Sequence, residues 1–178
     1  MRNFLYVDNS NVWIEGMYVS AVARGLAPSL GFAHEHRRCD YDYKMDFGKL
    51  LAFAGGERHE VGRAVLYGSR PPANDSLWGA AKRQGFEVIV HDRNPSGEKK
   101  VDTNIVTDII TDSYERMDLK EDEITLVSGD ADFVPTIEQL RKRGFHFNVV
   151  FWDHAARELR DACTEFTSLN KYLDHLRH

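Results

Sequence analysis

The 178-residue sequence is short of cysteine, of long apolar runs and of net positive charge, and each shortage excludes a class of protein. Its two cysteines, Cys39 and Cys163, are distant and form no CxxC pair, which argues against a disulfide framework or a zinc ribbon. No stretch reaches the roughly 18 apolar residues of a membrane span. The opening MRNFLYVDNS lacks the apolar core of a signal peptide. We therefore expect a cytoplasmic protein with no membrane partner.

The net charge and the amino-acid composition further limit the kinds of protein that the sequence can be. A formal net charge of −5 argues against a protein that coats nucleic acid by bulk electrostatics, because that mode of binding needs a basic face. It leaves room for local binding where cations supply positive charge. The length, with 42% hydrophobic and 29% charged residues, fits a single globular domain over residues 1–178.

Short branched-aliphatic runs alternate along the chain with segments of helical periodicity. The apolar runs predict strands at residues 3–7, 62–68, 86–92, 124–127 and 147–152. Helical patterns predict helices at residues 10–24, 46–54, 73–84, 101–117 and 132–143. This alternation is typical of an α/β fold, here a three-layer α/β/α sandwich with a mostly parallel central sheet. We expect residues 25–45 to form an irregular insertion and residues 93–100 a loop, because both lack periodicity.

Acidic residues follow two of the predicted strands, at the edge where an open parallel sheet binds its ligands. Asp8 ends the first strand, and Asp130 and Asp132 follow the fourth strand after a Ser-Gly turn. At about 100° per residue, Asp102 falls near the centre of the apolar stripe of the fourth predicted helix. That helix starts from the same edge of the sheet, so we expect the four carboxylates to converge.

Converging carboxylates repel one another unless they are protonated or neutralised by a cation. Oxygen ligands without histidine or cysteine suit Mg²⁺ or Mn²⁺, and such a cluster suits one or two ions. The chemistry that uses this arrangement is phosphoryl transfer to water.

Each acid also has a purely structural interpretation. Asp132 can be the N-cap of the helix that follows it, and Asp130 can stiffen its turn. Asp8 can belong to a capping cluster, and Asp102 can complement a helix dipole in the first turn. Their combination at one edge favours the functional interpretation.

Three motifs and a closing segment make the sequence resemble the NYN domain family, the LabA-like branch of the PIN-like nucleases. YVDNSNVW is similar to the opening motif, with Asp8 and Asn11 at its polar positions. KKVDTNIVTDII resembles the second motif, with Asp102 and Asp108 at its acidic positions. ARELRDACTEFTSL resembles the closing segment. The segment LVSGDADFVPTIEQLRKRGFHFNVVF is similar to the third motif and matches it at Ser128, Asp130, Asp132 and Phe133.

The resemblance implies a PIN-like fold and a metal-dependent endoribonuclease. In that interpretation Asp8, Asp102, Asp130 and Asp132 are catalytic and bind Mg²⁺ or Mn²⁺, directly or through water. The substrate that it implies is RNA, expected to be single-stranded.

By the same matching, Asn11 and Ser128 are candidates to orient a carboxylate or a phosphate. Asp108 is a weaker candidate, because on its helix it lies about 240° from Asp102 and the two cannot easily face one ion. The sequence departs from the family pattern with Asn9, where glycine is frequent, and with its long segment at 25–45.

Basic residues outside the motifs are candidates for substrate binding. Lys99 and Lys100 immediately precede Asp102 and are placed to meet phosphates. Arg37 and Arg38 lie in the irregular segment and can bind the backbone of a single-stranded nucleic acid. Solvated surface charge is the alternative for all four.

The segment HEHRRCD adds a loosely spaced set of possible transition-metal ligands, His34, His36 and Cys39. A solvated loop is the alternative. We also predict a homodimer, because exposed helices of small domains often pair.

A function of another class remains open. The chain can be a non-catalytic module that keeps a PIN-like fold and binds RNA or a protein partner. The complete set of motif acids favours the enzyme.

Overall fold

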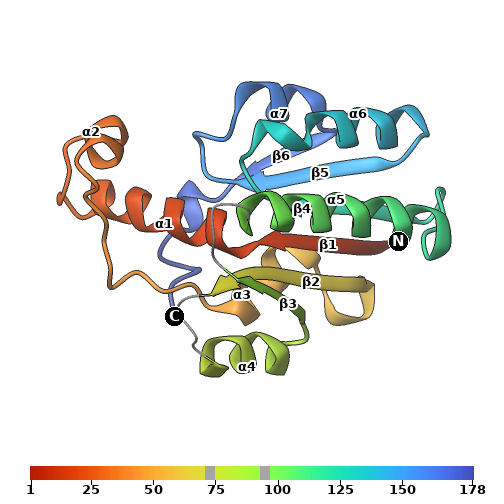
Figure 1. The fold of residues 1–178 in the computed structure, drawn as a ribbon, viewed down its shortest axis with the longest axis horizontal. Helices are drawn as coiled ribbons and strands as arrows, with labels where there is room; N and C mark the ends of the chain where they lie inside the picture. Colours follow the sequence, from red (N-terminus) through yellow and green to blue (C-terminus); the bar gives the residue numbers. More distant parts are fainter. Residues whose placement is uncertain (71–74, 93–96) are drawn as a thin grey trace.

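The structure, a computed structural model, describes residues 1–70, 75–92 and 97–178, with only the backbone described at 70, 75 and 97–99. Its six strands form one sheet in the order β3-β2-β1-β4-β5-β6, and all neighbouring pairs are parallel (Figure 1). The strands are β1 (Arg2–Asp8), β2 (Val61–Arg70), β3 (Glu87–Asp92), β4 (Asp122–Val127), β5 (His146–Phe151) and β6 (Glu165–Ser168).

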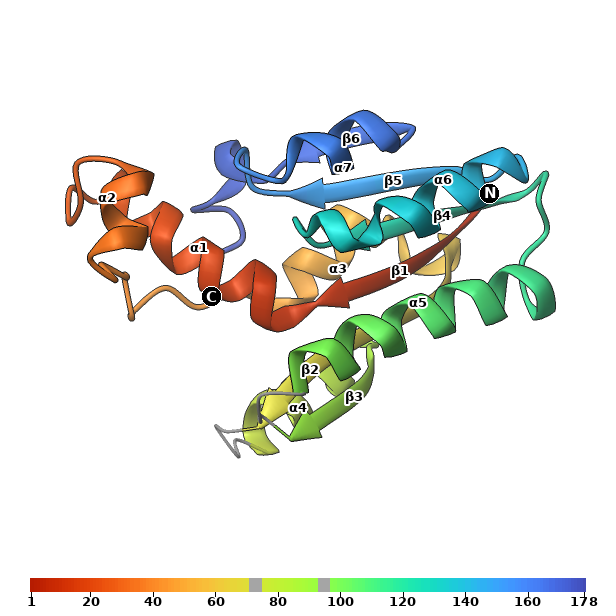
Figure 2. The same ribbon diagram turned by 45° about the horizontal axis from the view of Figure 1, so that its top comes forward.

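Helices cover both faces of the sheet, and the two views in Figures 1 and 2 agree that α5, α6 and α7 lie opposite α3 and α4. The α-helices are α1 (Asn9–Ala23), α2 (Leu30–Glu35), α3 (Phe47–Gly55), α4 (Asp75–Gln84), α5 (Gly97–Glu115), α6 (Val134–Lys142) and α7 (Arg157–Ala162). Short 3₁₀ turns occur at η1 (Arg58–Glu60), η2 (Ala131–Phe133) and η3 (Asn170–Tyr172). Among the described residues, no helix is both long and apolar enough to cross a bilayer.

The central strand β1 shows why its sequence is apolar almost without interruption. Phe4 and Tyr6 pack into the core beneath α5 and α6, whereas Leu5 and Val7 pack into the core shared by α1, α3 and α4. Successive side chains of a strand point to opposite faces, so a strand covered on both sides needs apolar residues at every position. All four side chains are buried.

The expected three-layer α/β/α sandwich is confirmed, and its sheet is parallel throughout. All five predicted strands and five predicted helices are present among the described residues, although residues 73–74 of one predicted helix lie outside them.

Three elements were not expected from the sequence. The edge strand β6 has only four residues and a mostly polar sequence, EFTS, and α7 has only six residues, so neither is long enough to give a clear periodic pattern. The segment at 25–45 is not wholly irregular, because it contains α2, which is capped by the side chain of Ser29. The loop expected at 93–100 is helical from residue 97, and residues 93–96 lie outside the described chain.

One buried carboxylate anchors the segment at 25–45 to the rest of the molecule. Asp40 is 2% exposed. It accepts hydrogen bonds from Ser20 Oγ of α1 at 2.6 Å and from Arg24 Nη1 at 3.1 Å, and Arg177 Nη1 lies 3.8 Å away. The segment that carries α2 is therefore held against α1 and the C-terminal region.

Asp40 predicts a pH-dependent contribution to stability. Burial alone raises the pKa of Asp40, but hydrogen bonds from Ser20 and Arg24 outweigh it and hold the pKa below its usual range. A carboxyl with a depressed folded-state pKa stabilises the fold above its unfolded-state pKa of about 3.9, and this contribution is lost as the pH falls through the folded-state value. We expect Asp40→Asn to lower the free energy of unfolding by about 2 kcal/mol near pH 7, and by less near pH 3, in urea denaturation.

The exposed neighbour Asp42 provides the matched control, and Asp42→Asn should change the free energy of unfolding by less than about 0.5 kcal/mol. An equal loss for Asp40→Asn at both pH values would contradict the electrostatic account.

Candidate functional site

The candidate site lies between β1 and β4, where the order in which the chain adds strands to the sheet changes direction. From β1 the sheet extends through β2 and β3 on one side and through β4, β5 and β6 on the other. The parallel register pairs Val7 with Val127, which brings Asp8 at the end of β1 beside Ser128 at the end of β4. In open α/β sheets, ligands bind in the crevice at such a switch point, outside the carboxyl ends of the strands.

Hydrogen bonds join the two chain segments that leave the sheet at this point. Asp8 is buried and forms the N-cap of α1, where its Oδ1 accepts from the Asn11 backbone N–H at 3.3 Å. Asn11 Oδ1 in turn accepts from the Gly129 backbone N–H at 3.0 Å. The Ser128 hydroxyl lies 3.2 Å from Asn11 Oδ1 and 3.5 Å from Asp8 Oδ2, so it can donate to either. Asn11 and Ser128 therefore hold the first turn of α1 against the turn after β4.

The turn after β4 requires glycine at its centre. A Cβ atom on Gly129 would lie 2.3 Å from the ring of Phe151, which is too close for any side chain. The next residue, Asp130, caps η2 by accepting from the Asp132 backbone N–H at 2.9 Å. The tight turn thus fixes where the two acids leave the backbone.

Two of the four acids have the structural role that the sequence also suggested for them. Asp8 and Asp130 are caps, and in each of them a single carboxylate oxygen, Oδ1, accepts the capping bond. A capping role therefore leaves the second oxygen for a ligand. Asp132 does not cap α6, whose N-cap is Phe133, and its side chain is exposed.

The structure brings the four predicted acids together. Asp102, Asp130 and Asp132 each offer a carboxylate oxygen, and these oxygens all lie within 4.8 Å of one another. Asp8 joins Asp102 and Asp130 in the lining of a cavity of about 150 Å³, which we call the acid cavity. Asp102 comes from the first turns of α5, as expected from its position in the helix.

The electrostatics of the acid cavity suit a cation. The pKa of Asp8 is raised to about 7, chiefly by burial and also by the charges of Asp102 and Asp130, against the lowering effect of the Asn11 N–H. A carboxylate in this environment is stabilised by positive charge. The ligand atoms are carboxylate oxygens, which are the donors that Mg²⁺ and Mn²⁺ prefer, so these residues fit a hard divalent ion.

Asp108 lies apart from the acid cavity. Its carboxylate accepts from the Tyr67 hydroxyl at 2.6 Å and from the Asn104 side-chain amide at 3.2 Å. The structure therefore gives Asp108 partners on β2 and on its own helix, in keeping with its angular distance from Asp102.

The basic residues predicted to bind substrate are on the surface. Lys100 is exposed in the first turn of α5, and the side chain of Lys99 lies outside the described residues. Arg37 and Arg38 are exposed beyond α2 and line neither the acid cavity nor the larger cavity beside it.

The sequence-based prediction missed residues that line the acid cavity, among them Ser10, Glu15 and Ser69. A signal for Glu15 is present, because it follows Asn11 by four residues and therefore lies on the same face of α1. Ser69 belongs to β2, and only the assembled sheet brings it near α1.

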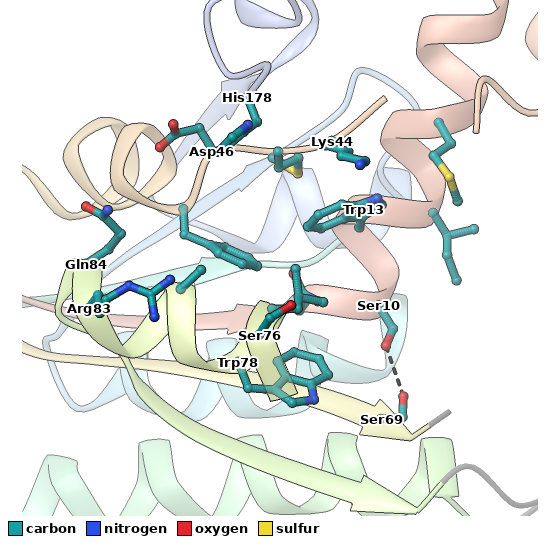
Figure 3. Close-up of a pocket in the computed structure, with 17 residues that line it drawn as sticks. Ser10, Trp13, Lys44, Asp46, Ser69, Ser76, Trp78, Arg83, Gln84 and His178 are labelled. Carbon is teal, nitrogen blue, oxygen red and sulfur yellow. Dashed lines mark hydrogen bonds between the residues drawn. The ribbon is translucent and has the colours of Figure 1, made fainter. Parts of the chain in front are cut away.

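A larger cavity of about 680 Å³ adjoins the acid cavity (Figure 3). The two share Ser10, Ile14 and Ser69, and the hydroxyls of the two serines lie 3.0 Å apart at the common boundary. Its lining combines aromatic and basic side chains, among them Trp13, Phe47, Trp78, Lys44 and Arg83. We call it the aromatic cavity.

The sequence is similar to a known protein family and to a known protein. The family model described as NYN domain matches residues 10–170. The low amplitude and bright protein LabA of Synechococcus elongatus is 37% identical over 81 residues, an alignment that covers 45% of this chain and 43% of LabA. The chain thus matches less than half the length of that relative.

A solved structure supports the fold alone. A Vibrio parahaemolyticus protein of unknown function has a TM-score of 0.63 at 19% identity, with 94% of this chain and 93% of the other covered. Since the family model matches most of the sequence, in a chain whose acids meet at the switch point of a parallel sheet, the protein belongs to the NYN domain family, which has a PIN-like, nuclease-type fold.

Proposed function

We propose that the protein is a metal-dependent endoribonuclease that hydrolyses phosphodiester bonds of single-stranded RNA. The observation that carries the proposal is the convergence of four aspartates from three separate segments of the chain: Asp8, Asp102 and Asp130 line the acid cavity, and Asp132 lies close to Asp102 and Asp130. Structural caps account for two of these acids but not for the approach of Asp102 to Asp130 and Asp132.

Asp8, Asp102, Asp130 and Asp132 would hold Mg²⁺ or Mn²⁺. When bound, the ion supplies positive charge that stabilises the phosphate in the transition state and favours attack by water. Asn11 and Ser128 keep the acids in place, because their hydrogen bonds join the cap of α1 to the turn after β4. Pre-organised ligands avoid the cost of rearrangement on binding.

The aromatic cavity supports RNA as the substrate. It is continuous with the acid cavity through shared residues, and the half-buried ring of Trp13 lines it. Aromatic side chains stack on unpaired bases without strong sequence preference. We propose that a base next to the scissile phosphate occupies this cavity, while Lys99 and the exposed cations Lys100, Arg37 and Arg38 contact the RNA backbone.

Asp130→Asn tests the catalytic proposal. Asparagine retains an oxygen that can accept the capping bond from Asp132, so the local fold should persist while a metal-binding charge is lost. We expect cleavage of a labelled single-stranded RNA, with Mg²⁺ or Mn²⁺, to fall by about 100-fold or more. Without metal, the melting temperature should stay equal or rise, because one repulsive charge is removed.

Asp161→Asn, which changes an exposed acid of α7, is the matched control and should cleave as the wild type does. EDTA should abolish cleavage in both the control and the wild type. Absence of cleavage across several RNAs and a DNA, with wild-type protein and metal, would reject the nuclease and favour the non-catalytic binding module.

Trp13→Ala tests the substrate. Loss of the stacking surface should weaken binding of a fluorescently labelled single-stranded RNA by about 10-fold. Measurement by fluorescence anisotropy in the Asp130→Asn background keeps the RNA intact. Tyr114→Ala removes an exposed aromatic ring from α5, outside both cavities, and should leave the affinity unchanged. Equal effects of the two substitutions would contradict a specific role for the aromatic cavity.

A further inference from the structure

A second group of metal-ligating side chains lies beside the acid cavity and has a different chemistry. Glu15, His34 and His154 offer one carboxylate oxygen and two imidazole nitrogens, and these atoms all lie within 4.8 Å of one another. Both histidine Nε2 atoms lie 2.7 Å from the same atom, Glu15 Oε2. We call these residues the His-Glu cluster.

The three residues come from segments that are distant in sequence. Glu15 belongs to α1, His34 to α2, and His154 to the connection between β5 and α7. In Figures 1 and 2, α2 projects with α1 beyond the sheet. The His-Glu cluster therefore joins this projecting helix to α1, whose Glu15 lines the acid cavity, and to the connection between β5 and α7.

Aromatic rings hold both imidazoles in place. The ring of Tyr18 lies 4.6 Å from that of His34, and the ring of Phe151 lies 5.9 Å from that of His154. The side chains of Glu15 and His154 are only 22% and 24% exposed, whereas that of His34 is 38% exposed. An ion can thus reach the cluster from the His34 side and find the other two ligands already positioned.

Within the part of the chain that the structure describes, the charge of Glu15 has no permanently charged counter-ion. Among the described residues, its ion pairs are with the two imidazoles and with no lysine or arginine. A divalent ion bound between Glu15 Oε2 and the two Nε2 atoms would supply the compensating positive charge.

We propose that Glu15, His34 and His154 bind a transition-metal ion of the Zn²⁺ class. Two imidazole nitrogens and one carboxylate oxygen are a common protein ligand set for Zn²⁺, with a further position left for water or substrate. Mg²⁺ and Mn²⁺ prefer the oxygen-only acid cavity, so the chain carries two sites of different selectivity. The bound ion clamps α2 and the segment at 25–45 to the rim of the acid cavity. This site does not depend on nuclease activity.

The test is a calorimetric titration of the metal-free, full-length protein with Zn²⁺, in excess Mg²⁺ that occupies the acid cavity. We expect one equivalent of Zn²⁺ to bind and to raise the melting temperature by about 5 °C. Co²⁺ bound in place of Zn²⁺ should show the visible absorption of a nitrogen-ligated ion, which Zn²⁺ then displaces. His34→Ala and His154→Ala should each weaken binding by about 100-fold.

Two controls separate the His-Glu cluster from other sites. His36→Ala changes an exposed histidine just beyond α2 that is outside the cluster, and it should bind Zn²⁺ as the wild type does. Asp130→Asn should also retain Zn²⁺ binding, whether or not the protein cleaves RNA. The proposal is overturned if the wild type binds no Zn²⁺, if His36→Ala weakens binding as much as His34→Ala, or if Asp130→Asn abolishes it. Because His34 is the most exposed ligand, its variant keeps the test valid even if His154→Ala misfolds.

Discussion

The parallel pairing of β1 with β4 is the constraint on which the site depends. Chain connections leave the two strands in opposite directions, so the crevice opens where Asp8 and Ser128 are neighbours. Both strands are buried on both faces, and a slip of one residue would exchange their two apolar faces and misplace the acids. Asn11 then fixes the local geometry, because its side chain accepts hydrogen bonds from the turn that begins the Asp130 segment.

This arrangement concentrates negative charge at a buried position, and the surrounding hydrogen bonds make that possible. The bonds that cap α1 and η2 place Asp8 and Asp130 without consuming both oxygens of either carboxylate. The elevated pKa of Asp8 reflects the electrostatic cost of placing these acids together, since burial and neighbouring charges both favour its protonated form. A bound cation would offset this local loss of stability. The burial of β1 side chains in both cores provides stability that offsets this cost.

Features that depend on interactions between residues near one another in sequence were predicted correctly, and features that depend on long-range contacts were not. The strands and longer helices were predictable because burial imposes a local periodicity, and Asp102 was predictable because its helix face follows from angular spacing. The short elements β6, α2 and α7 contain too few residues for a clear periodic pattern, so tertiary contacts define them. Asp108 illustrates the limit of motif matching, because its pairing with Tyr67 depends on how α5 packs on β2.

The sequence by itself determined the α/β alternation, the parallel sheet and the acids at the ends of strands, since these properties follow from periodicity and from order along the chain. Only the tertiary structure decided that the acid cavity continues into the aromatic cavity through Ser10 and Ser69. It also decided that His34 meets Glu15 and His154 rather than the nearby His36 and Cys39. The physical reason is that such contacts join residues separated by tens to more than a hundred positions, and their geometry arises from packing, which no local pattern encodes.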